Sequence, residues 1–330
     1  MNAAPKLALI SNPLSYTNSR SRPDLLEQME IQIEQAGGWS AQVYDDESLC
    51  DAVKVALAEG CKLIIANGGD GTIQGVASEL QRQQRSDVAM AVLPGGRTNV
   101  IAADLGMRGA TDALLHALLQ RWQNGQLQLE KRAILRLAQD ETPDRFGFLV
   151  NGAGIANLIE ACWAFRERYR RWGMFGGFGT GFYVAMRLIS GLLGARVFPI
   201  HQARCYWNHD GEAQLWSDHL AAFSLTTNEV LPLGVSPYAE PGSEQALKGF
   251  KATVINGEAT AVAWRMVLGA VAKGLGLSHA RGVITGLPQQ VIIAADQELP
   301  YHLDGEAYRL PAGHRLTISR AEDLQLVSFK

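Results

Sequence analysis

The chain has 330 residues, 47% of them hydrophobic and 19% charged, which predicts a globular protein of about two domains. Thirty basic and 33 acidic residues give a net charge of −3, which argues against a broad surface for nucleic acid. The four cysteines form no C-x-x-C pair, so we expect neither a zinc site nor a disulfide framework, and a reducing, cytoplasmic setting fits this cysteine usage. No apolar stretch is long enough to span a membrane.

Residues 1–129 alternate short apolar strands with amphipathic helices. The pattern predicts strands at 6–10, 41–44, 61–66 and 88–93, and helices at 24–36, 49–59 and 72–84. Strict alternation of strand and helix is typical of an α/β domain with a parallel sheet and crossover helices. Ligands of such sheets bind beyond the carboxyl ends of the strands, and the glycine-rich loops at 68–71 and 95–96 fall there.

Residues 130–330 have a different character. Most of this half consists of short strands separated by turns, which predicts an antiparallel β-sandwich domain. Two apolar segments, at about 158–194 and 257–275, are predicted to be helical insertions. The last strand of the chain could return to the first domain.

The stretch "NGGDGTIQG" (67–75) places glycines around one carboxylate, Asp70, directly after a predicted strand. One interpretation is a tight strand-to-helix turn in which Thr72 caps the helix. The other is a nucleotide loop, because a carboxylate tolerates phosphates when a divalent cation lies between them. Mg²⁺ commonly binds one or two carboxylates together with phosphate oxygens and water.

Four motifs in this order resemble the diacylglycerol kinase catalytic domain family, which includes bacterial lipid kinases, diacylglycerol kinases and sphingosine or ceramide kinases. They are "SNPLS", "GGDGT", "LPGGRTNVIAADLG" and "LDGEAY". The resemblance implies an α/β nucleotide domain, a β-sandwich lipid domain and a cleft between them that holds ATP and Mg²⁺. It implies a lipid kinase that phosphorylates a hydroxyl of a diacylglycerol-like or sphingoid lipid.

The same resemblance assigns the site residues. Glu306 would be the general base, with Asp304 beside it facing the transferring phosphate, and Asp70 would hold the metal. If "YHLDGEAY" is extended, Asp304 and Glu306 point to the same face of the strand. The residues assigned to the nucleotide are Asn12, Ser15, Gly68, Gly69, Asp70, Gly71, Thr72, Gly96, Arg97, Thr98 and Asn99.

Several positions depart from the family pattern. Arg97 stands where the family usually has threonine, Val100 where it has aspartate, Gln74 where it has asparagine, and Tyr16 where it has glycine. A lipid- or nucleotide-binding protein without catalytic activity is therefore an alternative. An NAD kinase-like enzyme is another, because that distant relative shares the G-G-D-G-T loop. The second D-G-E triplet, at 210–212, is predicted to be a hairpin turn without a catalytic role.

Residues 165–194 combine arginines with an apolar, aromatic and glycine-rich run. Arg166, Arg168, Arg170 and Arg171 precede Trp172, Phe175 and Phe178. This pattern suits an element at a membrane surface, although a helix packed on the sandwich would look similar. We expect peripheral membrane association, a lipid substrate and no nucleic-acid partner, and the chain could form a homodimer.

Overall fold

The computed structural model describes residues 6–21, 24–97, 99–140, 142–169, 176–192, 199–208, 213–229, 249–256 and 282–330. Several predicted features lie outside these residues, among them Thr98, the triplet at 210–212, the helical segment at 257–275 and the aromatic–arginine stretch at 170–175.

The first domain contains a mostly parallel sheet, which is six-stranded within the described part of the chain. Its order is β2-β1-β3-β4-β18-β5, and β5 is antiparallel to β18. The strands are β1 (Lys6–Ser11), β2 (Trp39–Gln42), β3 (Cys61–Gly68), β4 (Ala89–Pro94), β5 (Leu129–Arg132) and β18 (Leu324–Val327). β5 spans the predicted boundary between residues 129 and 130, and β18 brings the end of the chain back to β4.

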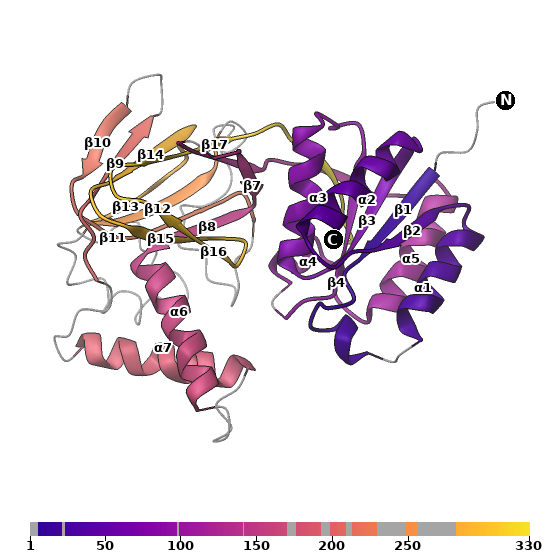
Figure 1. Ribbon diagram of the computed structural model, residues 1–330, viewed down its shortest axis with the longest axis horizontal. Coiled ribbons are helices and arrows are strands. Elements are labelled where there is room, and N and C mark those ends of the chain that lie inside the picture. Colours follow the sequence, from indigo (N-terminus) through magenta and orange to yellow (C-terminus); the bar gives the residue numbers. More distant parts are fainter. Residues whose placement is uncertain are drawn as a thin grey trace.

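Helices connect these strands and cover the sheet (Figure 1). They are α1 (Leu25–Gln35), α2 (Asp46–Ala58), α3 (Asp70–Arg82), α4 (Val100–Asp104) and α5 (Thr111–Gln123), with a short 3-10 turn at Asn18–Arg20. α1 buries Leu25, Met29 and Ile33, whose spacing of four residues places them on one helical face. α2 begins before the predicted residue 49 because the Asp45 carboxylate caps it, accepting the Ser48 N–H at 2.8 Å.

The second domain is an antiparallel sandwich of two sheets around one core (Figure 1). One sheet contains β10 (Ala213–Ser217), β9 (Ala203–Asn208), β14 (Gln290–Ala295), β17 (Arg315–Arg320), β6 (Leu135–Gln139) and β7 (Arg145–Gly147), in this order. The other contains β13 (Val283–Gly286), β12 (Lys251–Asn256), β11 (Leu220–Thr226), β8 (Leu149–Ala153), β15 (Leu299–Leu303) and β16 (Glu306–Leu310). The predicted fold class is confirmed.

Two helices, α6 (Gly154–Arg168) and α7 (Gly176–Leu192), extend from the sandwich (Figure 1). They are the helical insertion predicted at 158–194. Phe165 of α6 packs against the rings of Phe182 and Tyr183 of α7, with ring centroids 6.1 and 5.2 Å apart. Among the described helices, none combines the length and apolar character needed to cross a membrane.

Candidate active site

Two glycine-rich loops meet at the carboxyl edge of the parallel sheet. Gly68 ends β3 and Gly69 follows it, and Gly95 and Gly96 follow β4. A Cβ on Gly95 would lie 2.8 Å from the Cα of Gly68, and one on Gly96 would lie 2.6 Å from the Cα of Gly69. Because no side chain fits between them, glycine is required for the two loops to touch. The loops predicted to bind phosphates therefore form one surface.

Asn99 holds the second loop in shape. Its side-chain Oδ1 accepts the Gly96 N–H at 2.7 Å, and its Nδ2 donates to the Gly96 carbonyl at 3.0 Å. Asn99 has a φ of 49°, in the left-handed region that asparagine tolerates better than most residues. The Asn99 side chain is thus engaged within the loop and stabilises its shape.

The loop after β1 completes this edge. The Asn12 side chain donates to Thr72 Oγ1 at 3.3 Å, and Ser15 Oγ donates to the Asn12 carbonyl at 2.9 Å. Thr17, which the motifs did not single out, donates its N–H to Gly95 and its hydroxyl to Gly96, at 2.8 and 3.0 Å. Asn12 and Ser15 therefore lie beside the glycine loops.

Asp70 is the first residue of α3, with Gly69 as the N-cap, so Thr72 does not cap this helix as one interpretation of the sequence expected. Oδ1 of Asp70 accepts the Val100 N–H at 3.0 Å, which links the starts of α3 and α4. Burial raises the pKa of Asp70 to about 6, although the N–H groups of Val100, Ile101 and Asn99 favour the ionised form. The carboxylate is therefore held by fixed backbone donors at the point where the two loops meet.

The segment that contains Asp304 and Glu306 is a tight hairpin turn between β15 and β16. Leu303 pairs with Glu306, and the two residues between them, Asp304 and Gly305, have φ values of 49° and 95°. The expectation of an extended strand with Asp304 and Glu306 on one face is wrong. Asp-Gly favours positive φ at both central positions of a two-residue hairpin, and this local preference decides the geometry.

The turn directs the Asp304 carboxylate into the protein. Its Oδ1 and Oδ2 accept the Phe148 N–H at 3.2 and 2.9 Å, and Oδ1 also accepts the Leu149 N–H at 2.8 Å. Burial, and next the charge of Asp70, raise the pKa of Asp304 to about 8. Asp304 thus fixes the hairpin to the start of β8, close enough to Asp70 for their charges to interact.

Glu306 points to the other domain. A Cβ on Gly71, in the first turn of α3, would lie 2.9 Å from Oε1 of Glu306. The side chain is otherwise exposed to solvent. The structure therefore brings Glu306 of the β-sandwich against the helix start that carries Asp70, and this contact crosses the domain interface.

Side chains of α3 that the motifs did not identify hold this interface together. Gln74 Nε2 and Ser78 Oγ both donate to the Phe146 carbonyl of β7, each at 3.1 Å. Gln74 was noted only as a departure from the family pattern, and nothing in the sequence marks Ser78 or Phe146. These bonds fix α3 against the strand that leads to the Asp304 anchor.

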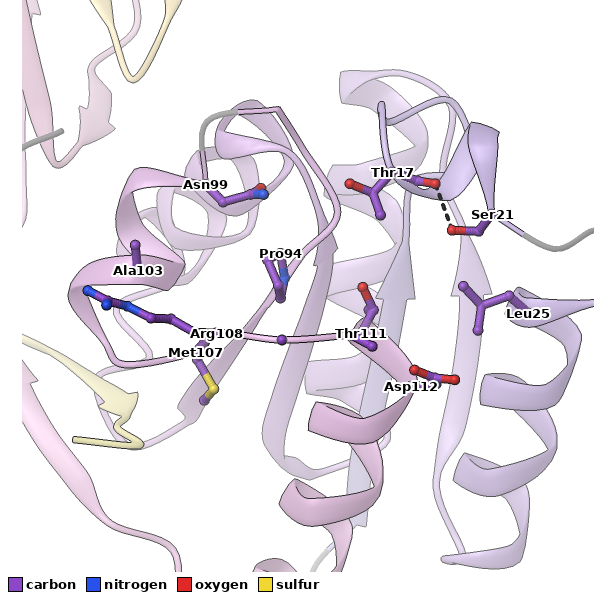
Figure 2. A pocket seen from close by; sticks show the side chains of 12 residues that line it. Thr17, Ser21, Leu25, Pro94, Asn99, Ala103, Met107, Arg108, Thr111 and Asp112 are labelled. Carbon is purple, nitrogen blue, oxygen red and sulfur yellow. Dashed lines mark hydrogen bonds between the residues drawn. The ribbon is translucent and has the colours of Figure 1, made fainter. Parts of the chain in front are cut away.

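A separate cavity of about 490 Å³ lies beside the second glycine loop (Figure 2). Figure 2 shows Asn99 at one end of it, with Thr17 and Ser21 on the opposite side and Thr111 of α5 between them. Asn99 is the one predicted site residue that lines it, and Asp70 and Glu306 do not. The cavity therefore borders the glycine loops through Thr17 and Asn99, and its lining does not include Asp70 or Glu306.

Comparison with solved structures shows which known proteins share this two-domain fold. A diacylglycerol kinase from Bacillus anthracis str. Sterne is 13% identical, with a TM-score of 0.63, 98% of this chain and 96% of that chain covered. The yeast NADH kinase complexed with NADH is 11% identical, with a TM-score of 0.50, 100% of this chain and 84% of that chain covered. The chain has the two-domain fold that these kinases share.

Comparison of the sequence with protein-family models identifies the kind of kinase that the first domain resembles. Residues 6–127 match the family of the diacylglycerol kinase catalytic domain, which confirms the resemblance recognised in the motifs. No curated protein matches the chain. The matched residues contain both glycine loops and Asp70, whereas the hairpin with Glu306 lies beyond them.

Proposed function

We propose that this protein is an ATP- and Mg²⁺-dependent lipid kinase, which transfers the γ-phosphoryl group to a hydroxyl of a diacylglycerol-like or sphingoid lipid. One observation carries the proposal, namely that Glu306 reaches from the β-sandwich to Gly71, next to Asp70 and the paired glycine loops. A proton acceptor and a phosphate-binding edge, each supplied by a different domain, thereby meet at one point.

The glycine loops supply the nucleotide's contacts. The missing side chains let the two loops pack backbone against backbone, and α3 starts there with first-turn N–H groups that have no partner within the helix. Phosphates are stabilised by such N–H groups and by the positive end of the helix dipole. Asn12, Ser15 and Asn99 keep the loops in place around them.

The donor set at this edge fits Mg²⁺. Asp70 accepts the Val100 N–H on Oδ1, and the N–H groups of Ile101 and Asn99 also stabilise it; a carboxylate has about four lone-pair sites, so it retains capacity for a cation. One or two carboxylates with phosphate oxygens and water are what Mg²⁺ commonly takes, and no cluster of three protein ligands is needed. When bound, the cation would neutralise charge that develops on the phosphates.

Glu306 would act as the general base and accept the proton of the lipid hydroxyl. The hydroxyl oxygen of the lipid then attacks the γ-phosphorus of ATP, and ADP leaves. Its exposed carboxylate can reach a substrate, whereas the Asp304 carboxylate is occupied by backbone N–H groups. We assign Asp304 the role of positioning the turn so that Glu306 faces Gly71. The resemblance had implied that Asp304 faces the transferring phosphate, and the positioning role takes the place of that assignment.

A lipid acceptor, rather than NAD, is favoured by α7. Phe182, Met186 and Ile189 are spaced at four and three residues, and all three are exposed. Such a stripe suits contact with acyl chains or a membrane surface.

The test of the proposed function is to incubate the protein with labelled ATP, Mg²⁺ and a panel of diacylglycerol, sphingosine, ceramide and NAD. Label in a lipid supports the proposal, label in NAD supports the kinase without the lipid, and label in none contradicts both.

A further inference from the structure

Tyr16 lies in the loop after β1, against the second glycine loop. Its neighbour Thr17 bonds to Gly95 and Gly96 through its N–H and its hydroxyl, so the backbone at Tyr16 is fixed there. The side chain is nevertheless 41% exposed. An exposed ring on a well-anchored backbone can serve as a rigid platform for other groups.

Two arginines contact this ring. The guanidinium carbon of Arg20 lies 4.0 Å from the ring centroid, and that of Arg97, in the second glycine loop, lies 4.5 Å from it. Both distances are within the range of a cation–π interaction. Both arginines are exposed, and neither forms an ion pair with a carboxylate of the described residues. Two positive charges are thus concentrated on one ring without a neutralising partner in that part of the protein.

This arrangement favours an anion between or beside the two guanidinium groups. Like charges repel, so bringing them together has a cost that a bound anion removes, and each guanidinium can bind phosphate oxygens through two parallel N–H bonds. The ring restricts the Arg97 side chain, which reduces the entropy lost when Arg97 takes hold of a ligand. Arg97 directly follows Gly96, which packs on Gly69 at the start of the Asp70 loop.

We infer that Tyr16 is a positioning residue that holds Arg97, with Arg20, against the phosphate groups of the nucleotide. This inference rests on the proposed function for the identity of the anion, a nucleoside triphosphate. Tyr16 acts through the arginines and does not itself touch the phosphates. The rival role for an exposed ring is to stack on the nucleobase, and the test below separates the two.

The test compares Mg²⁺-bound ATP with Mg²⁺-bound inorganic tripolyphosphate, which has no base, by titration calorimetry. Arg97→Gln is expected to weaken both ligands about 10- to 100-fold, the usual range for losing a hydrogen bond to a charged group. Tyr16→Leu is expected to weaken both about 2- to 10-fold, since it removes only the platform. Tyr16→Phe keeps the ring and is expected to bind like the wild type.

The double variant Tyr16→Leu/Arg97→Gln is expected to weaken binding by less than the product of the two single effects, because part of the ring's effect passes through Arg97 and only the part that passes through Arg20 remains. Arg121→Ala is the matched control. It removes another guanidinium–ring contact, 4.0 Å from the Phe329 centroid, at the end of α5 distant from the loops. Thermal unfolding of each variant separates lost binding from lost folding.

Three results would overturn the inference. An effect of Tyr16→Leu on ATP but not on tripolyphosphate would mean that the ring contacts the base. Additive effects in the double variant would mean that the ring acts without Arg97. If the enzyme is active and the KM for ATP is unchanged in both Tyr16→Leu and Arg97→Gln, the inference is wrong while the proposed function still holds. If the variants bind both ligands as expected but the wild type phosphorylates no lipid, the inference about Tyr16 holds and the proposed lipid acceptor is wrong. If the wild type binds neither ATP nor tripolyphosphate, the inference and the proposed function are both wrong.

Discussion

Glu306 and Gly71 lie so close that a single methyl group would disturb them: a Cβ on Gly71 would lie 2.9 Å from Oε1 of Glu306. The two residues belong to different domains and are separated by most of the chain. The absence of a side chain at position 71 therefore gives the carboxylate its place next to Asp70. This relationship makes the site sensitive to changes that leave both domains folded.

Gly71→Ala is expected to lower kcat about tenfold or more while leaving the fold intact. The new methyl group displaces a flexible carboxylate, and displacements of about 1 Å in a catalytic group can cost up to ~100-fold. Stability is expected to rise slightly, because alanine is favoured over glycine in a helix by about 0.5–1 kcal/mol. Steady-state kinetics and thermal unfolding check the two parts. A variant with unchanged kcat would show that Glu306 does not need its observed position.

Glu306→Gln is expected to reduce kcat about 10²–10⁴-fold, the usual contribution of a general base, with little change in ATP binding. Glu298→Gln is the matched control, because Glu298 is an exposed carboxylate next to the opposite end of the same hairpin. Kinetics and calorimetry with ATP check the prediction. Equal effects of the two substitutions would remove Glu306 from the mechanism.

Asp70→Asn is expected to abolish Mg²⁺-dependent ATP turnover without unfolding the protein. Asparagine is nearly isosteric and its Oδ1 can still accept the Val100 N–H, but it lacks the charge that attracts a divalent cation. Turnover measured over a range of Mg²⁺ concentrations, with thermal unfolding as the check on folding, tests this. Wild-type turnover in the variant would assign the metal to other residues.

The fold was predictable because its signals are local and repeated. Alternating strands and helices in the first domain, and short strands in the second, follow directly from hydrophobic periodicity and turn residues. Element ends were less predictable, since they depend on single contacts such as the Asp45 cap of α2. The predicted helix at 72–84 in fact begins at Asp70 because Gly69, not Thr72, is the N-cap.

The sequence motifs select the residues of the candidate site, but they do not give its geometry. The motifs identified Asp70 and Glu306, and the glycines explain why the two loops can touch. The direction of each side chain in the 304–306 turn follows from positive φ angles and from the Phe148 and Leu149 N–H groups. These donors lie over 150 positions away in the chain, and no sequence pattern records such a contact.

Asp304 predicts a pH dependence of stability. Burial raises its pKa from 3.8 to about 8, so the folded protein holds this proton more tightly than the unfolded chain does. Its contribution to stability is full below about pH 4 and is lost as pH rises to about 8. Asp304→Asn does not titrate, so the free energy of unfolding of the wild type minus that of the variant is expected to fall over this interval.

Urea unfolding of both proteins at pH 5 and pH 8 measures that difference. Asp296→Asn is the control, because Asp296 is an exposed carboxylate paired with Arg204 on the sandwich. A difference between wild type and Asp304→Asn that stays constant or grows with pH would show that the Asp304 carboxylate is ionised throughout.

The exposed stripe on α7 predicts peripheral membrane binding. Phe182, Met186 and Ile189 are 46%, 40% and 57% exposed, although the Phe182 ring also contacts Phe165 of α6. The apolar face would enter the boundary between head groups and acyl chains, and nearby arginines such as Arg168, at the end of α6, would attract anionic head groups. Cosedimentation with phosphatidylglycerol vesicles, at low and high salt, measures this binding.

The double substitution Phe182→Ser/Ile189→Ser is expected to reduce the bound fraction at every salt concentration, because it removes apolar area that would be buried in the lipid. High salt is expected to weaken binding of the wild type, because it screens the arginines. Ile31→Ser serves as the control, since Ile31 is a similarly exposed apolar residue on α1 of the other domain. Equal binding to neutral and anionic vesicles, or no loss in the double variant, would show that α7 does not dock on lipid and that its apolar side chains serve another contact.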